Sequence, residues 1–307
     1  MVYKLLKEFK GAMCVMVTPF KKNGDVDIEQ LKSFTTHLVD KGVRGLSMVG
    51  STGEFYALSE KERLLVVKTV IDAAKGKALT IPGVGAMTTK EAINYAKSAE
   101  DLGADAVLLP PPYYFVLNPR ELKGYFEEVV SSIEIPVVLY NAPAATGNDI
   151  TPELANELSE RFDNVKYVKE SCLDIVTVHK TVNLKGVTVF AGLDHMVLPM
   201  LGVGCKGFMV ISVNIIPELM VSLWNYFEKG EMKKALELHN RLYPLFELVT
   251  GGGPDIHFVQ YAKEAMNLLG MNVGAPRKPL LPLDEARREQ LRKTLESILG
   301  RSIPKKA

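Results

Sequence analysis

The sequence predicts an α/β protein, a (β/α)8 TIM barrel followed by a C-terminal helical region. Short apolar runs alternate regularly with longer helical patterns along most of the chain. The runs are nearly continuous in Val, Ile, Leu and Met, which is typical of parallel strands covered on both faces. Eight such runs, each followed by a helix-like segment, match the repeat of this barrel. A doubly wound open sheet is the alternative, because periodicity alone does not show that a sheet closes.

The expected strands are 11–20, 45–50, 79–85, 106–111, 136–141, 165–171, 187–192 and 207–212. The helices between them carry recognisable start signals at Asp27, Ser59, Thr88, Asn118 and Thr151. A glutamate follows Ser59 and Thr88 three residues later, which is the spacing of a capping box. A proline follows Asn118 and Thr151 at the first helical position.

After residue 223 the strand signals stop. The segments 226–250, 255–270 and 283–300 predict three further helices, and "GGGPD" (251–255) is read as a break between two of them, without a ligand. We therefore expect a barrel domain at 1–223 and a helical region at 224–307.

Composition restricts the partners and the compartment. The chain has 307 residues, 47% of them hydrophobic, and a net charge of +1 with both signs interspersed, which does not indicate a nucleic-acid partner. Cys14, Cys172 and Cys205 are widely spaced, which suits a reducing compartment. Lysines near the N-terminus interrupt any signal-peptide core, and no apolar run is long enough to span a membrane. We expect a cytoplasmic globular protein.

Common cofactor and metal motifs are missing from the sequence. "GVGCKG" (202–207) has the glycine spacing of a dinucleotide fingerprint, but it follows a helix and precedes a strand, the reverse of the required context. No P-loop or H-E-x-x-H motif occurs, and the five histidines are scattered. No histidine is placed to activate Cys172, so we read it as an inert thiol. We expect neither a metal nor a cofactor.

The segment "VKYVKES" (165–171) contains a lysine where apolar packing is expected. Val165, Tyr167 and Lys169 share one strand face, and Lys166 lies on the other. A strand-end lysine ordinarily reaches solvent. Active residues of a (β/α)8 barrel, however, come from the C-terminal ends of its strands. The polar residues at those ends are Thr18, the "GSTGE" turn (50–54), Tyr113, Tyr114, Tyr140, Asn141 and Lys169.

These residues predict chemistry at a carbonyl group. A lysine inside a barrel loses the solvation of its charged form, which favours the neutral, nucleophilic amine and a Schiff base with a ketone or aldehyde. Tyr140 ends the preceding strand, and its hydroxyl could shuttle protons. The "GSTGE" turn offers backbone N–H groups and two hydroxyls to a carboxylate, although a plain turn gives the same pattern. Tyr113 and Tyr114 could equally pack on a rim or interface.

Six motifs in order carry a family resemblance: "GSTGE", "PPYY" (111–114), "YNAP" (140–143), "VKES" (168–171), "AGLD" (191–194) and "GFMVISV" (207–213). From about residue 11 to "KPLLPL" (278–283), the chain resembles the dihydrodipicolinate synthase / N-acetylneuraminate lyase family. This implies a class I, pyruvate-linked aldolase, usually a homotetramer, with pyruvate and an aldehyde as reactants and no cofactor beyond the covalent lysine.

The resemblance also implies residue roles. Lys169 would carry the Schiff base and Tyr140 would transfer protons. Ser51 and Thr52 would hold the keto acid's carboxylate, with Thr52 also in the hydroxyl relay. The remaining matches are Tyr114, which would reach a neighbouring subunit's site, and Gly192 and Ile211, which would line the pocket.

One position departs from the synthase pattern. In "YNAPAATG", Ala145 stands where synthases carry an arginine for the second substrate's carboxylate, a contact that a methyl group cannot replace. Ser51, in place of the usual synthase threonine, is a weaker departure shared with neuraminate lyases. The stretch is similar to the "YN-x-P-x-A-T-G" form of 2-keto-3-deoxygluconate aldolases.

Ala145 therefore favours reversible cleavage of a 2-keto-3-deoxy sugar acid to pyruvate and an aldehyde. Dihydrodipicolinate synthase is the second hypothesis, because another basic residue could replace the arginine. A keto-acid dehydratase and an N-acetylneuraminate lyase are related alternatives. A non-catalytic keto-acid sensor and a metal-dependent barrel enzyme are readings from other classes.

Overall fold

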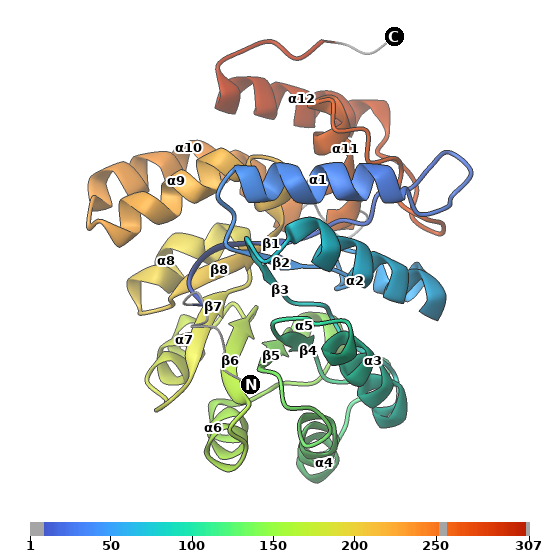
Figure 1. Cartoon of the computed structure of the whole chain (residues 1–307). Helices are drawn as coiled ribbons and strands as arrows, with labels where there is room; N and C mark the ends of the chain where they lie inside the picture. The colour runs from blue at the N-terminus through green and yellow to red at the C-terminus, as the bar shows by residue number, and fades with distance from the viewer. Residues whose placement is uncertain (1–8, 252–256, 305–307) are drawn as a thin grey trace.

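The eight strands form one parallel sheet that closes on itself. The computed structural model describes residues 9–251 and 257–304, and Figure 1 shows helices around a central ring of strands. The strand order is β3-β2-β1-β8-β7-β6-β5-β4. A parallel bridge between Gly83 and Leu108 joins the two ends of this order, and the N–H of Leu108 donates to the carbonyl of Pro82 at 2.9 Å. The barrel prediction is confirmed, and the open sheet is excluded.

Each predicted strand is present, and all eight are shorter than expected. The strands are β1 Gly11–Val15, β2 Gly45–Ser47, β3 Leu79–Thr80, β4 Val107–Leu109, β5 Val137–Asn141, β6 Val165–Glu170, β7 Thr188–Ala191 and β8 Gly207–Val210. The β1 segment ends early because a side chain takes over its hydrogen bonding: the N–H of Val17 donates to Oδ1 of Asn214 at 3.0 Å.

The helices follow the strands as the alternation predicts. Around the barrel they are α1 Ile28–Asp40, α2 Glu60–Ala74, α3 Thr89–Asp101, α4 Pro119–Val130, α5 Pro143–Thr146, α6 Pro152–Arg161, α7 Ile175–Val182, α8 Val197–Gly202 and α9 Pro217–Glu228. Three 3-10 turns accompany them: η1 Phe55–Ala57, η2 Asp194–Met196 and η3 Ile211–Asn214. All five expected N-caps accept a backbone N–H of the first turn. "GVGCKG" joins α8 to β8, as expected of a plain turn.

The C-terminal region contains α10 Met232–Gly251, α11 Phe258–Leu268 and α12 Glu285–Leu299. Figure 1 shows α11 and α12 beside α1. The expected helix at 226–250 is wrong at its start: α9 ends at Glu228, and Gly230 turns the chain with a φ of 73° before α10 begins. Residue 223 lies inside α9, so this helix crosses the expected boundary, and the division into two units stays a prediction. Most of "GGGPD" and residues 1–8 lie outside the described residues.

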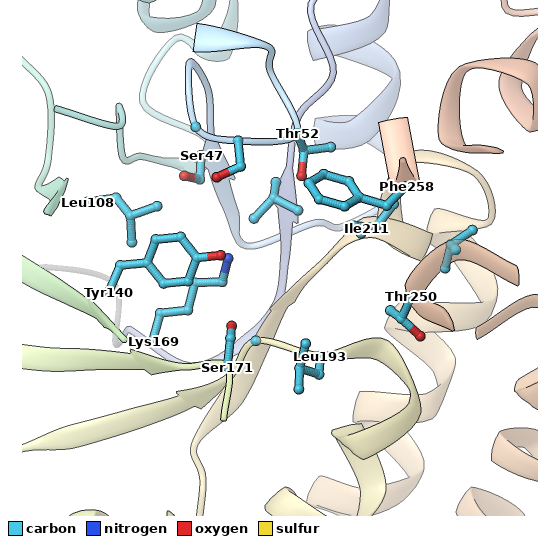
Figure 2. Close-up of a pocket in the computed structure, with 15 residues that line it drawn as sticks. Ser47, Thr52, Leu108, Tyr140, Lys169, Ser171, Leu193, Ile211, Thr250 and Phe258 are labelled. Carbon is cyan, nitrogen blue, oxygen red and sulfur yellow. The ribbon is translucent and has the colours of Figure 1, made fainter. Parts of the chain in front are cut away.

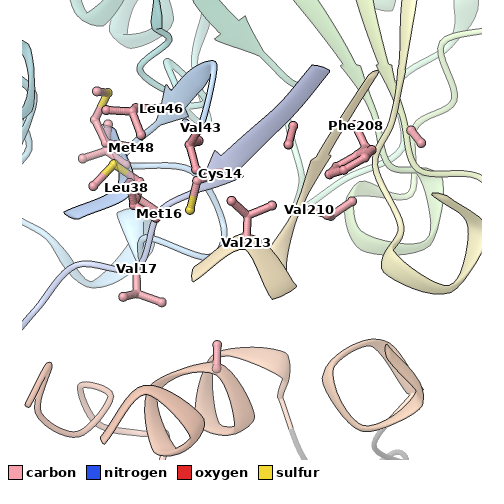
Figure 3. Packing of buried hydrophobic residues seen from close by; sticks show 14 of the residues in the cluster. Cys14, Met16, Val17, Leu38, Val43, Leu46, Met48, Phe208, Val210 and Val213 are labelled. Carbon is pink, nitrogen blue, oxygen red and sulfur yellow. The ribbon is translucent and has the colours of Figure 1, made fainter. Parts of the chain in front are cut away.

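Two layers of apolar side chains pack on the two faces of the barrel wall. Inside the barrel, Met13, Leu79, Val138, Phe190 and Met209 are completely or almost completely buried. The larger layer lies between strands and helices; Figure 3 shows part of it around β1, β2 and β8. Because β-strand side chains alternate, residues above the inner layer point into the mouth of the barrel. Within the described part of the chain, no helix is both long and apolar enough to cross a membrane.

Candidate active site

Lys169 and Tyr140 lie side by side at the C-terminal ends of adjacent strands. They are paired in the register between β5 and β6. Lys169 is only 4% exposed, and its Nζ lies 3.9 Å from the centroid of the Tyr140 ring. On the same face of β6, Tyr167 stacks on Phe9 inside the barrel, with ring centroids 4.3 Å apart. The neighbour relation predicted from the sequence is confirmed.

Lys166 takes the ordinary role of a surface lysine. Its side chain is 42% exposed, and its Nζ lies 3.8 Å from Asp163. The two lysines of "VKYVKES" therefore lie in opposite environments, as strand alternation predicts. The predicted neutral state of the Lys169 amine remains a prediction.

One cavity at the mouth of the barrel gathers almost all the predicted site residues. Figure 2 shows Lys169 and Tyr140 on one side of this cavity and Thr52 across from them. Its lining includes Ser51, Thr52, Tyr140, Lys169, Gly192 and Ile211. Tyr114 does not line it; its side chain is 84% exposed on the loop after β4. Its predicted place in a neighbouring subunit's site stays a prediction.

The turn 50–54 is a compact loop with its backbone folded back on itself. The N–H of Gly53 donates to the carbonyl of Gly50 at 3.0 Å, and that of Glu54 donates to Ser51 at 3.2 Å. Thr18, predicted as a strand-end polar residue, donates from Oγ1 to the carbonyl of Gly53 at 2.7 Å. Thr18 therefore stabilises the turn through this hydrogen bond and does not line the cavity.

Gly192 lies against the lysine side chain. A Cβ at this position would be 3.1 Å from Cε of Lys169 and 2.8 Å from the carbonyl oxygen of Glu170. Because Gly192 has no side chain, there is room for the Lys169 side chain to reach the cavity. The placement fits the predicted pocket-lining role.

Asp194, the aspartate of "AGLD", holds the loop that carries Ile211. Its two carboxylate oxygens accept the N–H groups of Ile211 at 3.2 Å and Ser212 at 2.7 Å. The side chain is completely buried, and burial raises its pKa, against these hydrogen bonds, which lower it. Asp194 is thus a support for the cavity wall that sequence reasoning did not assign.

The cavity also contains residues that the sequence did not reveal. Ser47 and Ser171 line it, and their buried hydroxyls have no hydrogen-bond partner among the described residues. Leu193, Thr250 and Phe258 also line the cavity, across from Tyr140 (Figure 2). Buried hydroxyls without a protein partner are available to a polar ligand. Their hydroxyl type was visible in the sequence, but their lack of partners was not.

Beside the site, Glu170 and Asn141 brace the loops rather than face the cavity. Nδ2 of Asn141 donates to Glu170 at 3.1 Å and to Asp149 at 2.9 Å. Burial and the neighbouring Glu170 raise the pKa of the Cys172 thiol to about 12. A thiol with that pKa stays protonated at neutral pH, which supports the reading of Cys172 as inert.

Charge inside the cavity is sparse. Among the described residues that line it, Lys169 is the one basic residue, and none is acidic. Ala145 lies exposed on α5, just after the strand of Tyr140. Within residues 9–251 and 257–304, no three His, Cys, Asp or Glu side chains are grouped so that they could hold a metal ion.

Comparison with known proteins places this architecture in one family. The family model described as the dihydrodipicolinate synthetase family matches residues 8–298. The chain belongs to this family. It is 36% identical over 289 residues to the 4-hydroxy-tetrahydrodipicolinate synthase of Methanococcus vannielii, covering 94% of this chain and 98% of the relative.

Solved structures in the dihydrodipicolinate synthetase family have the same fold. Dihydrodipicolinate synthase from Thermotoga maritima superposes with a TM-score of 0.90 at 30% identity, covering 95% of this chain and 99% of that one. YagE, a prophage protein of E. coli K12 in this family, was solved in complex with pyruvate; it has a TM-score of 0.88 at 29% identity, with 95% and 99% covered.

Family membership makes the chain a carbon–carbon lyase of the class I aldolase type, which works through a lysine Schiff base. The resemblance found in the sequence is therefore confirmed. The named relatives support our second hypothesis, the synthase, better than the first, the sugar-acid aldolase. Ala145 disagrees with the synthase names of the relatives on one point, the second substrate, because it stands where synthases bind that substrate's carboxylate.

Proposed function

We propose that Lys169 forms a Schiff base with pyruvate or a longer 2-keto acid, and that the chain makes or breaks the C3–C4 bond, which joins the carbons α and β to the former carbonyl. The observation that carries this proposal is the pairing of Lys169 with Tyr140 at the mouth of the barrel: a buried amine whose Nζ lies 3.9 Å from the ring of a tyrosine. A buried lysine amine without a carboxylate partner is a nucleophile suited to a carbonyl.

In the cleavage direction, the neutral amine of Lys169 attacks C2 of the keto acid, and loss of water gives an iminium ion. A base removes the proton of the C4 hydroxyl, the C3–C4 bond breaks, and its electron pair moves to the iminium nitrogen. An aldehyde leaves and an enamine remains. Protonation at C3 and hydrolysis by water release pyruvate and the free amine. We assign the proton transfers to Tyr140 together with Thr52, because both line the cavity that Lys169 enters.

The turn 50–54 is the proposed anchor for the keto acid's carboxylate. Ser51 and Thr52 face the cavity from this turn, and their hydroxyls and N–H groups are the donors that a carboxylate requires. Gly192 and Ile211 shape the wall around the lysine. No metal or other cofactor is needed for these steps.

For the second substrate, our first candidate is an uncharged aldehyde, so that the full substrate is a 2-keto-3-deoxy sugar acid. Two observations support this choice. The first is Ala145 in place of the synthase arginine. The second is that the described residues lining the cavity include no basic residue besides Lys169. The hydroxyls of Ser47 and Ser171, which have no partner in the part of the chain that the structure describes, suit the hydroxyl groups of a sugar chain.

The second candidate is 4-hydroxy-tetrahydrodipicolinate synthase, which condenses pyruvate with aspartate semialdehyde. It is favoured by the names of the relatives, which are 33–37% identical over almost their whole length. In that case a basic residue from elsewhere, for instance from a neighbouring subunit, takes the place of the arginine at Ala145.

A direct comparison of turnover decides between the two candidates. The purified chain is given 2-keto-3-deoxygluconate and N-acetylneuraminate, with pyruvate release followed, and pyruvate plus aspartate semialdehyde, with condensation followed. The proposal predicts that kcat/KM for the sugar acid is the highest. Faster condensation with aspartate semialdehyde would establish the synthase instead, and release of water without carbon–carbon cleavage would indicate a dehydratase.

The variant Ala145→Arg sharpens this comparison. A guanidinium can hold a carboxylate by two parallel hydrogen bonds, each charge-assisted. We expect the variant to lower KM for aspartate semialdehyde by about tenfold and to leave pyruvate binding unchanged. Ala144→Arg, at the neighbouring exposed position of α5, is the matched control. If wild type already condenses pyruvate with aspartate semialdehyde efficiently and Ala145→Arg slows that reaction, the result supports the synthase candidate.

A further inference from the structure

Glu54, the last residue of the "GSTGE" turn, is completely buried and forms an ion pair with a lysine from the C-terminal region. Its Oε1 lies 2.6 Å from Nζ of Lys263 on α11, and the side chains are 0% and 1% exposed. Its Oε2 accepts the backbone N–H of Arg277 at 2.8 Å. Both oxygens of this carboxylate are therefore held by the segment that follows the barrel.

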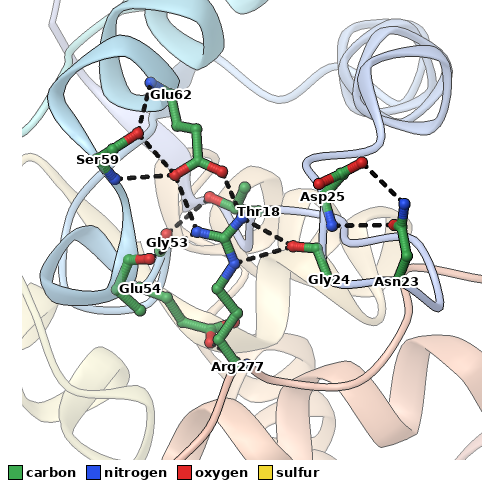
Figure 4. Close-up of polar contacts among 10 residues, drawn as sticks. Thr18, Asn23, Gly24, Asp25, Gly53, Glu54, Ser59, Glu62 and Arg277 are labelled. Atoms are coloured by element: carbon green, nitrogen blue, oxygen red, sulfur yellow. Dashed lines mark hydrogen bonds and ion pairs between the residues drawn. The ribbon is translucent and has the colours of Figure 1, made fainter.

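Lys263 has two further contacts besides the ion pair with Glu54. Its Nζ donates to the carbonyl of Ala275 at 3.2 Å and lies 3.9 Å from the centroid of the Phe20 ring. Arg277 forms a second connection: its guanidinium donates to the carbonyl of Gly24 and the carboxylate of Glu62 (Figure 4). It also donates to the carbonyl of Ala57. Loops after β1 and β2 are thereby tied to the C-terminal region.

The turn that these contacts hold has an unfavourable backbone. Val49, which enters it, has a φ of 48°, and Glu54, which ends it, has a φ of 56°. The left-handed region is unfavourable for residues other than glycine, most of all for a β-branched residue such as Val49. Such conformations persist only where surrounding contacts impose them, and they cluster at functional sites. The Glu54–Lys263 pair supplies such a contact at one end of the turn.

We propose that Lys263 is a positioning residue: through Glu54 it holds the turn 50–54 in the conformation in which Ser51 and Thr52 receive the substrate's carboxylate. Neither Lys263 nor Glu54 lines the cavity, so both act through the turn. The proposal rests on the carboxylate-binding role given to that turn above. It assigns part of the active site's geometry to the C-terminal helical region, which the sequence presented only as an appendage.

The test uses two ketones that differ in the carboxylate. Wild type and Lys263→Met are treated with borohydride and either pyruvate or acetone, and the adduct on Lys169 is quantified by peptide mass analysis. Acetone presents the carbonyl without the carboxylate, so its trapping does not depend on the turn. We expect Lys263→Met to raise the pyruvate concentration for half-maximal trapping by about tenfold and to trap acetone at the wild-type rate.

Two further variants separate positioning from stability. Lys263→Met leaves the carboxylate of Glu54 buried without its partner, which destabilises a fold, whereas Glu54→Gln/Lys263→Met removes both charges. We expect this double variant to unfold near the wild-type temperature and still to bind pyruvate weakly. Glu264→Gln, which breaks the 2.7 Å pair with Arg288 one position further along α11, is the matched control with unchanged trapping.

The outcomes are distinct. If the double variant binds pyruvate like wild type, or if pyruvate and acetone trapping fall together, Lys263 is only a structural residue and the proposal is wrong. If wild type itself gives no pyruvate adduct on Lys169, the proposed function fails first. That result is visible before any variant is made.

Discussion

At the scale of single residues, Gly192 shows how closely the site is fitted around its lysine. Three atoms would surround an added Cβ: Oγ of Ser171 at 2.0 Å, the carbonyl oxygen of Glu170 at 2.8 Å and Cε of Lys169 at 3.1 Å. The serine could rotate away, but the carbonyl belongs to β6 and cannot move without the strand. A methyl group here therefore displaces either the strand or the lysine.

We predict that Gly192→Ala lowers kcat by about 100-fold, because a displacement of about 1 Å at a reacting group has an effect of this size. Pyruvate release measures the effect, and circular dichroism checks that the variant folds. Gly202→Ala is the control, since a Cβ built there meets no described atom within 4 Å beyond its chain neighbours and the backbone of its own helix. Equal activity of the two variants would show that Lys169 does not need the space beside Gly192.

The sequence could predict Lys169, Tyr140 and part of the cavity lining around them, but not the free hydroxyls of that lining. Strand alternation and the order of the strands placed these two residues in adjacent positions of the barrel mouth. Ser47 and Ser171 were not predicted, because a serine in a sequence carries no sign of whether its hydroxyl will find a hydrogen-bond partner. That depends on contacts between segments far apart in the chain.

At the scale of elements, the start of α2 is tied to the C-terminal region by one ion pair. Ser59 and Glu62 form the capping box that the sequence predicted. Glu62 also accepts hydrogen bonds from the guanidinium of Arg277, one of them at 3.0 Å (Figure 4). The bond from Arg277 is the main reason that the pKa of Glu62 falls from 4.5 to about 2.

We predict that this pair makes stability depend on pH in acid. Because the folded-state pKa of Glu62 is depressed, its contribution is complete above pH 4.5 and is lost as the pH falls towards about 2. Glu62→Gln should lower the free energy of unfolding by about 1 kcal/mol at pH 7 and flatten its decline below pH 4.5. Urea unfolding at several pH values measures this, with Glu60→Gln in the same turn as control. An unchanged slope in Glu62→Gln would contradict the assignment.

At the scale of the whole molecule, the barrel was predictable and its union with the C-terminal region was not. Repeating strand and helix patterns are local signals, and they gave the correct count of strands. The pairs of Arg277 with Glu54 and of Lys263 with Glu54 join segments more than 200 residues apart; the Arg277 bond spans 223. No local sequence pattern predicts such a contact, and the sequence around Lys263 is that of an ordinary lysine on a helix surface.

Three consecutive exposed apolar side chains on the loop after β4 form a candidate interface between subunits. Tyr114, Phe115 and Val116 are 84%, 46% and 76% exposed. Adjacent exposed apolar residues of this kind are typical of interaction sites. From the family resemblance we predict a homotetramer, so that sedimentation gives about four times the chain mass of 33.9 kDa. Val116→Lys should dissociate it and reduce kcat if Tyr114 completes a neighbour's site. If the wild-type chain is a fully active monomer, both the tetramer and the role of Tyr114 in a neighbouring site are wrong.

The central claim is that Lys169 is the amine that reacts. The most direct measurement is borohydride reduction in the presence of pyruvate, followed by peptide mass analysis of wild type, Lys169→Ala and Lys166→Ala. We predict one adduct in the peptide containing Lys169, none in Lys169→Ala, and a wild-type yield in Lys166→Ala. An adduct that persists in Lys169→Ala, or wild type that gives none, would contradict the account.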